Sequence, residues 1–212
     1  MADVFGARAD SARRFAELLA TSGVDRGLIG PREVDRLWER HLLNSAVIGE
    51  LISPGCRVLD VGSGAGLPGL PLALSRPDLT IALLEPMARR VAWLREVTAE
   101  LDIPVEIHRG RAEDRPVAAR WDVVTARAVA PLGRLAGWCL PLLAPGGRML
   151  ALKGSSAADE VARDRGEVRR AGGGAIEVVE CGKSAVDPPT TVVVVASRRG
   201  DEGRRPRRRK DR

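Results

Sequence analysis

The sequence predicts an α/β fold with a seven-stranded sheet, mostly parallel, that ends in an antiparallel C-terminal hairpin and is preceded by N-terminal helices. From residue 56 onward, short apolar runs alternate with amphipathic helical segments, the pattern of a parallel sheet covered by helices on both faces. A glycine-rich turn follows the first of these runs. Only a turn-rich loop separates the last two runs, and it is too short for a parallel crossover.

The residues before the sheet are expected to form a helical cap. Residues 8–52 are expected to be helical. The first helix, ADSARRFAELLATSG (9–23), carries apolar side chains at helical spacing and stops at Gly23, a residue typical of helix ends. A second amphipathic helix is expected to begin at Pro31, because proline favours the first helical position. We therefore predict three parts: an N-terminal helical cap over residues 1–54, a core domain over residues 55–197 and a basic tail over residues 198–212.

The core domain is expected to contain seven strands and the helices that connect them. The strands are expected over residues 57–61, 79–84, 105–109, 122–126, 147–152, 175–181 and 190–197. The helices are expected over residues 68–75, 87–101, 131–143 and 158–171. The last two strands are expected to pair as an antiparallel hairpin at one edge of the sheet.

Composition narrows the class of protein. The 212 residues suit one domain with an appendage and a sizeable core. No apolar run approaches the about 20 residues of a membrane span, and the N-terminus has acids in place of the apolar stretch of a signal peptide. Three distant cysteines and two histidines have no disulfide or metal spacing. We expect a cytoplasmic monomer with no metal and no membrane attachment.

The net positive charge lies at the C-terminus. Residues 198–212 hold nine Arg and Lys against three Asp and Glu, and this net charge of +6 equals that of the whole chain. The rest of the chain has 25 bases and 25 acids. Such a segment is expected to be disordered and suits salt-sensitive binding to phosphate backbones. A tail that only aids solubility is the alternative.

The turn VLDVGSGAGLPG, residues 58–69, indicates a ligand site. Ligands of open α/β sheets bind beyond the carboxyl ends of the strands, where glycine lets the backbone approach them. Part of this run has the glycine spacing of a dinucleotide site. However, the Asp60 carboxylate would repel a pyrophosphate. The spacing of Asp60, Gly62, Gly64 and Gly66 and the reversed hairpin at the end of the sheet also argue against a dinucleotide.

These features, together with Glu85 at the end of the second strand, resemble class I S-adenosylmethionine-dependent methyltransferases, which have a Rossmann-like sheet. In that resemblance Asp60, Gly62, Gly64 and Gly66 form the first motif, which faces the methionine part of the cofactor. Glu85 is placed to accept both ribose hydroxyls. NAD sites use such an acid too, so an NAD-dependent oxidoreductase stays a more distant alternative. The structural alternative for the loop is a glycine-rich connection that binds no ligand.

Several stretches resemble a narrower family, the bacterial 16S rRNA guanine-N7 methyltransferases, first named glucose-inhibited division protein B. They are ERHLLNS (39–45), DVGSGAGLPGLPLAL (60–74), GRAED (110–114), DVVTARAVAPL (122–132) and LPLLAPGGRMLALKG (140–154). GSGAGLPG and ARAVAPL are not general methyltransferase motifs. The resemblance implies a transferase in rRNA processing that uses S-adenosyl-L-methionine to form 7-methylguanosine in 16S rRNA, at the guanine of rRNA position 527. Its partner would be 16S rRNA or the small ribosomal subunit.

The resemblance also implies functions for individual residues. Gly62 and Leu67 would line the cofactor site. Ala112 and Glu113 would flank the adenine, and Arg127 would face the site.

Two positions depart from the family pattern. Asn44 replaces an acid, and Met87-Ala88 replaces a more polar pair after the second strand. Neither is expected to touch the cofactor. The basic tail lies outside the resemblance.

The chemistry of guanine N7 agrees with the residues present. N7 carries a lone pair and no proton, so transfer depends on alignment and needs no general base. Methylation of an exocyclic amine usually involves an N/D-P-P-aromatic motif after the fourth strand, where this chain reads TARAVAPL; DPPT at residues 187–190 lacks the aromatic and is expected in a loop. Carbon methylation of cytosine needs a cysteine nucleophile, and Cys139 is expected to pack inside a helix. No catalytic residue is assigned beyond Arg127 as a positioning candidate.

Four residues are candidates for RNA contacts. Arg127 ends the fourth strand and suits the cofactor carboxylate, an rRNA phosphate or the guanine edge, with a structural ion pair as the alternative. Arg40 and His41 lie in the cap, where His41 equally suits the rim of the core. Lys153 ends the fifth strand and suits a phosphate. Two further alternatives remain for the whole chain: a class I methyltransferase acting on a small molecule or protein, and a non-catalytic RNA-binding protein.

Overall fold

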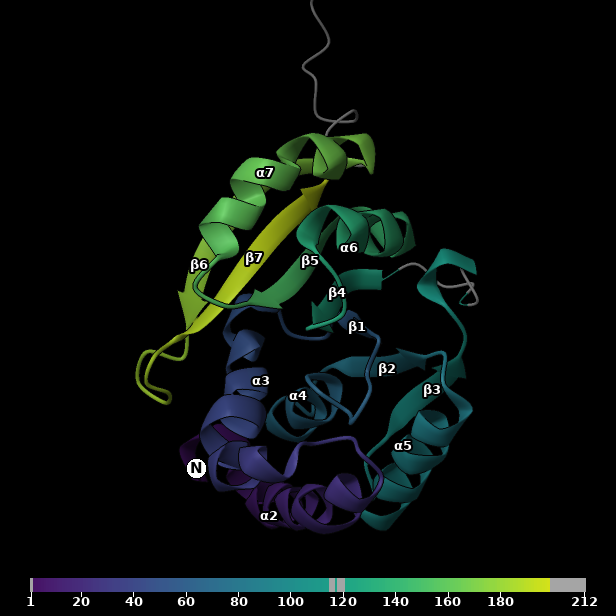
Figure 1. Cartoon of the computed structure of the whole chain (residues 1–212), viewed down its shortest axis with the longest axis vertical. Helices are drawn as coiled ribbons and strands as arrows, with labels where there is room; N and C mark the ends of the chain where they lie inside the picture. The colour runs from purple at the N-terminus through teal and green to yellow at the C-terminus, as the bar shows by residue number, and fades with distance from the viewer. Residues whose placement is uncertain (1, 115–116, 118–120, 199–212) are drawn as a thin grey trace, which may run out of the picture.

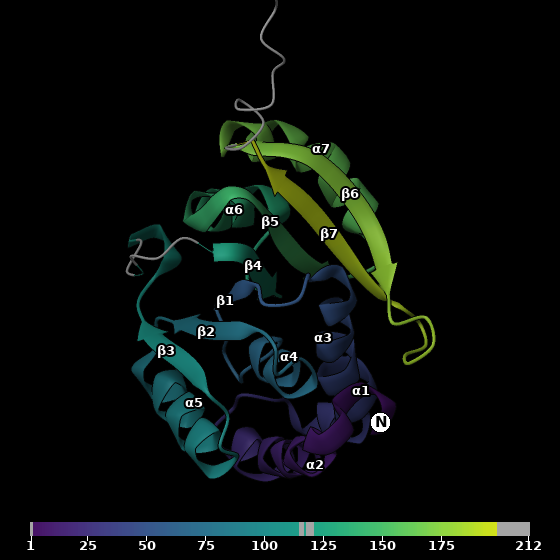
Figure 2. The ribbon, with the colours of Figure 1, turned by 180° about the vertical axis from the view of Figure 1, so that it is seen from behind.

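A seven-stranded mixed sheet forms the centre of the molecule (Figures 1 and 2). The computed structural model describes residues 2–114, 117 and 121–198, so all but the first residue of the predicted tail lies outside the described residues. The strand order is β3-β2-β1-β4-β5-β7-β6. The first five strands are parallel, and β7 runs antiparallel to both β5 and β6, which confirms the predicted fold class. The strands are β1 (Arg57–Val61), β2 (Thr80–Glu85), β3 (Val105–Arg109), β4 (Trp121–Arg127), β5 (Leu143–Lys153), β6 (Gly173–Cys181) and β7 (Thr190–Ser197).

The strands over residues 57–61, 105–109 and 190–197 have the predicted bounds, whereas β5 begins earlier than predicted. Its first residue, Leu143, pairs with Trp121 before the register shifts. The helix predicted over 131–143 is correspondingly shorter, because Pro141 has no N–H with which to continue an α-helix.

Helices cover both faces of the sheet. Figures 1 and 2 place α6 and α7 over one face and α4, α5 and the cap over the other. Among the described residues, no helix is both long and apolar enough to cross a lipid bilayer. The helices of the core domain are α4 (Gly69–Ser75), α5 (Ala88–Glu100), η6 (Ala112–Asp114), α6 (Leu132–Cys139), η7 (Leu140–Leu142) and α7 (Ala157–Arg170).

The cap elements adjoin one another along two stretches, residues 2–23 and 31–51, each of which mixes helical turns of different kinds. The second predicted helix does begin at Pro31, but its path is divided among 3₁₀, π and α turns. Phe15, Leu42 and Ile48 of the cap belong to the same buried cluster as Val58 and Ile81 of the sheet. The predicted boundary between the cap and the core domain at residue 54 therefore separates two parts that share one hydrophobic core, and it stays a prediction. The cap helices are α1 (Ala2–Phe5), η1 (Gly6–Arg8), α2 (Ala9–Leu18), η2 (Leu19–Gly23), η3 (Pro31–Arg36), η4 (Leu37–Leu43), α3 (Asn44–Ala46) and η5 (Val47–Leu51).

The carboxyl ends of β1 to β4 lie along one edge of the sheet. Parallel pairing brings Val61 of β1 beside Leu84 of β2, and Asp60 of β1 beside Thr125 of β4. Thr125 is two residues before the end of β4. The residues that follow these strand ends are those at which an open α/β sheet binds its ligand.

Candidate active site

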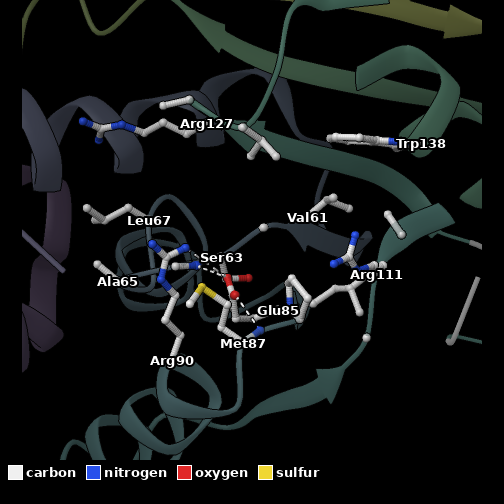
Figure 3. Close-up of a pocket in the computed structure, with 18 of the residues that line it drawn as sticks. Val61, Ser63, Ala65, Leu67, Glu85, Met87, Arg90, Arg111, Arg127 and Trp138 are labelled. Atoms are coloured by element: carbon white, nitrogen blue, oxygen red, sulfur yellow. Dashed lines mark hydrogen bonds and ion pairs between the residues drawn. The ribbon is translucent and has the colours of Figure 1, made fainter. Parts of the chain in front are cut away.

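A cavity of about 610 Å³ opens where β1 to β4 end (Figure 3). Its volume suits a small-molecule ligand, since such sites usually enclose about 300–1,000 Å³. The predicted site residues that line it are Gly62, Gly64, Leu67, Glu85, Ala112, Glu113, Arg127 and His41. Within the described chain, the predicted residues that do not line it are Asp60, Gly66, Arg40 and Lys153.

The loop after β1 presents bare backbone to the cavity. Gly62 and Gly64 adopt φ values of +72° and +55°, a conformation that L side chains rarely adopt. A Cβ at Gly62 would lie 2.9 Å from a methyl of Val129, which also lines the cavity. Glycine is thus needed here both for the turn and for the close approach of Val129.

Gly66 acts on the core side of the same loop. Its φ is +100°, and a Cβ there would lie 2.5 Å from the Leu70 side chain in the buried cluster. Gly66 therefore allows the loop to pack onto α4, and its predicted contact with the cofactor stays a prediction.

Asp60 anchors the loop from behind. Its side chain is fully buried, and Oδ2 accepts a hydrogen bond from the backbone N–H of Gly69 at 3.0 Å, the first residue of α4. Oδ1 has no hydrogen-bond partner in the described part of the chain. Burial raises the pKa of Asp60 to about 7. Because Asp60 does not line the cavity, it acts by holding the loop rather than by direct contact with a ligand.

Glu85 stands at the centre of the cavity, as Figure 3 shows. Its side chain is 1% exposed. Oε2 accepts the N–H of Gly64 at 2.9 Å, and Oε1 accepts the N–H of Met87 at 2.9 Å. A carboxylate has about four acceptor positions, so acceptor capacity remains for ligand hydroxyls.

Sequence reasoning missed several cavity residues. Met87 lines the cavity, a place that the sequence did not predict for it. Its place directly after the Glu85 strand end was an available signal. The cap also contributes a wall through Leu28 and Ile29, for which the sequence offers no signal.

Three arginines around the cavity were also missed. Arg90 on α5 places Nη1 3.9 Å from the Glu85 carboxylate, and its buried Nε has no partner in the described residues. Arg134 stacks over the ring of Trp138, 4.9 Å from its centroid, and both residues line the cavity. Figure 3 shows Arg111 and Trp138 at the end of the cavity opposite Arg127. The cavity therefore joins one buried acid to a cationic rim.

Arg127 lines the cavity, but its guanidinium is bonded to the cap. Nη1 donates to the carbonyl of His41 at 3.3 Å and to Ser45 Oγ at 3.1 Å. Nη2 donates to the carbonyl of Arg40 at 2.9 Å and lies 2.7 Å from His41 Nδ1. Neither an ion pair nor a free cation describes this arrangement: Arg127 joins β4 to η4.

His41 is buried rather than presented to solvent. Its side chain is 11% exposed, and Nε2 lies 2.9 Å from the Glu33 carboxylate. Burial and the nearby Arg127 lower its pKa, although Glu33 acts in the opposite direction. Both ring nitrogens are engaged within the protein. Only the neighbouring Arg40 projects an exposed side chain that would suit the predicted RNA contact.

Lys153 is also engaged within the protein. Its ammonium donates to the carbonyl of Ala130 at 2.9 Å and to Glu160 at 2.8 Å, and its side chain is 11% exposed. The same Glu160 oxygen accepts the N–H of Leu132, the first residue of α6. Lys153 therefore fixes the start of α6, and its predicted phosphate contact stays a prediction.

The remaining chemical candidates lie outside the site. Cys139 is fully buried in α6 as predicted, and burial raises the pKa of its thiol, so it cannot serve as a thiolate nucleophile. Residues 187–189 lie in the loop between β6 and β7, as predicted. Among the described residues, no group of three His, Cys, Asp or Glu is arranged to hold a metal ion.

Comparison with known families fits this geometry. The family model described as rRNA small subunit methyltransferase G matches residues 8–187, a range that includes every residue lining the cavity. The chain belongs to this family. A ribosomal RNA small subunit methyltransferase G from Rhodococcus jostii is 58% identical over 190 residues, which cover 88% of this chain and 84% of that protein. Its counterpart from Mycobacterium marinum is 57% identical, covering 88% and 83% of the two chains.

Solved structures support the fold of this methyltransferase G family member. A methyltransferase from Pyrococcus furiosus superposes with a TM-score of 0.57 at 12% identity, covering 73% of this chain and 80% of that one. A putative O-methyltransferase from Nostoc punctiforme gives a TM-score of 0.59 at 14% identity, covering 74% and 56%. At these identities the likeness shows the methyltransferase fold alone.

Proposed function

We propose that this protein transfers a methyl group from S-adenosyl-L-methionine to N7 of a guanine in 16S rRNA. The guanine is that of rRNA position 527, and the modification belongs to ribosome maturation. The protein acts as a cytoplasmic monomer on 16S rRNA or the small ribosomal subunit. The observation that carries the proposal is that the family match contains the whole of one cavity with a glycine loop and a buried acid at two adjacent strand ends.

The cavity fits the cofactor. When bound, S-adenosylmethionine supplies a methyl group on a positively charged sulfur. The bare backbone of Gly62 and Gly64 would admit its methionine part, and the remaining acceptor positions of Glu85 would take the ribose hydroxyls. Met87 and Ala112 are apolar neighbours of Glu85 in the same cavity and would flank the adenine.

The cavity also suits an acceptor atom that carries no proton. His41 is buried and engaged on both ring nitrogens, and the acceptor positions that remain on Glu85 are assigned to the ribose hydroxyls, so neither residue is assigned to proton removal. Guanine N7 requires only alignment with the methyl group and exclusion of water. The protein's contribution is therefore a fixed cavity rather than a proton-transfer residue.

The cationic rim supports an rRNA acceptor. Arg90 on α5, Arg111 in the loop before η6 and Arg134 on α6 line one cavity. Their positive charges suit the phosphates next to an unstacked guanine. A small-molecule acceptor, the first alternative, has no observation in its favour.

Methyl transfer to small-subunit particles tests the proposal. The full-length protein is incubated with labelled S-adenosylmethionine and particles from cells that lack it, and the RNA is digested to nucleosides. We expect label in 7-methylguanosine of 16S rRNA, at position 527, and none with the Glu85→Ala variant. Label in another nucleoside would overturn the N7 assignment. Tight cofactor binding without label in any RNA would overturn the rRNA acceptor.

A further inference from the structure

The contact between Arg127 and His41 specifies a protonation state. A guanidinium has only donors, so the His41 Nδ1 atom 2.7 Å from Arg127 Nη2 must act as an acceptor. The ring proton is then on Nε2, which donates it to the Glu33 carboxylate at 2.9 Å. The geometry therefore requires neutral His41, with each ring nitrogen in a distinct role.

This contact connects two walls of the cavity. Arg127 ends β4, and His41 lies in η4 of the cap; both line the cavity, although they are 86 residues apart. The carbonyls of Arg40 and His41 accept from the same guanidinium, so η4 is held against β4 by one side chain. The four contacts use both η nitrogens, which leaves Arg127 little capacity to bind a phosphate directly.

We propose that His41 is a positioning residue for methyl transfer: its neutral Nδ1 holds Arg127, and the pair fixes the cap wall of the cofactor cavity. This inference rests on the proposed function. Without an acceptor at Nδ1, the guanidinium would face a second N–H donor or a void. The three remaining contacts of Arg127 would then hold η4 less firmly against β4, and the cap wall, which includes Leu28 and Ile29, would open more often.

The charges around His41 set the pH range of the effect. Arg127 from β4 and Arg40 from η4 disfavour the imidazolium, whereas Glu33 from η3 favours it. Burial and these cations lower the pKa of His41 below its ordinary value. The contact between Arg127 and His41 Nδ1 is therefore complete above about pH 6.5, the ordinary histidine pKa. It is lost as pH falls through the lower pKa that His41 has in the folded protein.

Two substitutions separate the two ring nitrogens. His41→Asn places an amide oxygen at the Nδ1 position, where it accepts from Arg127 but cannot reach Glu33. His41→Gln reaches the Nε2 position and Glu33 but leaves Arg127 without this acceptor. Glu39→Gln, at an exposed position in the same turn, is the matched control.

Cofactor affinity and amide hydrogen exchange are measured on the full chain. We expect His41→Gln to raise the Kd for S-adenosylmethionine about tenfold and to speed exchange in residues 37–46, whereas His41→Asn stays within threefold of the wild type. The wild type should lose affinity for S-adenosylmethionine as pH falls through the lowered pKa of His41, and His41→Asn should lose less. Equal weakening in both variants with unchanged exchange, or an identical acid limb in His41→Asn, would overturn the proposal.

The exchange measurement separates this inference from the proposed function. Faster exchange in His41→Gln supports the positioning role even if the wild type methylates no rRNA. Unchanged exchange in His41→Gln overturns it even if the wild type is fully active. Thermal unfolding of each variant shows that the measured proteins are folded.

Discussion

The carboxylate of Glu85 accepts the backbone N–H of Gly64 at 2.9 Å. This bond ties the loop after β1 to the end of β2, so two adjacent strand ends share one fixed spacing. The second Glu85 oxygen accepts the N–H of Met87 just before α5. One buried side chain thus orders three segments of the cavity.

Replacement of Glu85 should therefore weaken cofactor binding strongly. Glu85→Ala removes the acceptors for Gly64, Met87 and the ribose hydroxyls, and we expect a Kd at least a hundredfold higher, equivalent to about 2.8 kcal/mol. Glu85→Gln keeps one carbonyl acceptor, so its Kd for S-adenosylmethionine should lie between those of the wild type and Glu85→Ala. Titration calorimetry with S-adenosylmethionine measures both variants. An unchanged Kd for Glu85→Ala would remove Glu85 from the cofactor site.

Asp60 should make stability depend on pH. Its folded pKa of about 7 lies above the ordinary value, so the folded protein binds more protons and its stability falls as pH rises from about 4 to about 7. Asp60→Asn keeps an acceptor for Gly69 without the charge. We expect the stability of this variant relative to the wild type to increase over that range, by up to about 1.4 kcal/mol per pH unit, and then to level off.

Urea unfolding of ligand-free protein at pH 5 and pH 8 measures this difference. Asp60→Ala is the companion variant, because it also removes the anchor of the loop. We expect it to abolish cofactor binding while the fold remains intact. If Asp60→Asn and the wild type keep a constant difference at both pH values, Asp60 does not titrate in this range.

Gly62 and Gly55 form a matched pair. Their φ values are +72° and +73°, but a Cβ at Gly62 meets Val129, whereas one at Gly55 has no atom within 4 Å. Each alanine variant should lose about 1–2 kcal/mol for the left-handed backbone. Only Gly62→Ala should also displace Val129 and weaken cofactor binding. Similar cofactor affinities in the two variants would show that the approach of Val129 is unimportant.

Lys153 should act on stability and not on RNA binding. Lys153→Met leaves Glu160 largely buried without its partner, and we expect a loss of about 1–3 kcal/mol of unfolding free energy. Lys183→Met removes an exposed pair with Glu180 and should cost less than about 1 kcal/mol. Arg111→Ala should instead lower the salt slope of rRNA affinity by about one. A reduced salt slope in Lys153→Met would restore its predicted phosphate contact.

Removal of residues 198–212 should weaken rRNA binding and flatten its salt dependence, because this segment carries the whole net charge of the chain. Filter binding at several salt concentrations compares the truncated and full chains. Cofactor affinity is the internal control and should not change. Identical salt slopes would mean that the tail is not a phosphate anchor.

The features that could be predicted from the sequence are local ones. Asp60, the glycines and Glu85 follow directly from two strand ends, and the strand order of an α/β sheet brings these ends together. Trp138 and Arg134 are four residues apart on α6, so the sequence predicts that they share one face of the helix. It does not predict that this face lines a cavity.

The features that sequence reasoning missed depend on distant contacts. Arg127 and His41 are 86 residues apart, and no periodicity indicates that a strand-end arginine will be saturated by cap carbonyls. Lys153 was judged by its place at a sheet edge, but its neighbour Glu160 comes from the following helix, α7. Tertiary packing, rather than position along a strand, decided whether each of these cations was free.

The core shared by the cap and the sheet has a consequence for synthesis of the chain. Phe15 and Leu19 leave the ribosome before Ile81 and Leu83, which belong to the same buried cluster. At about 5–20 residues per second, the cap waits several seconds for these strands. The nascent cap therefore exposes apolar side chains during that interval, until β2 emerges.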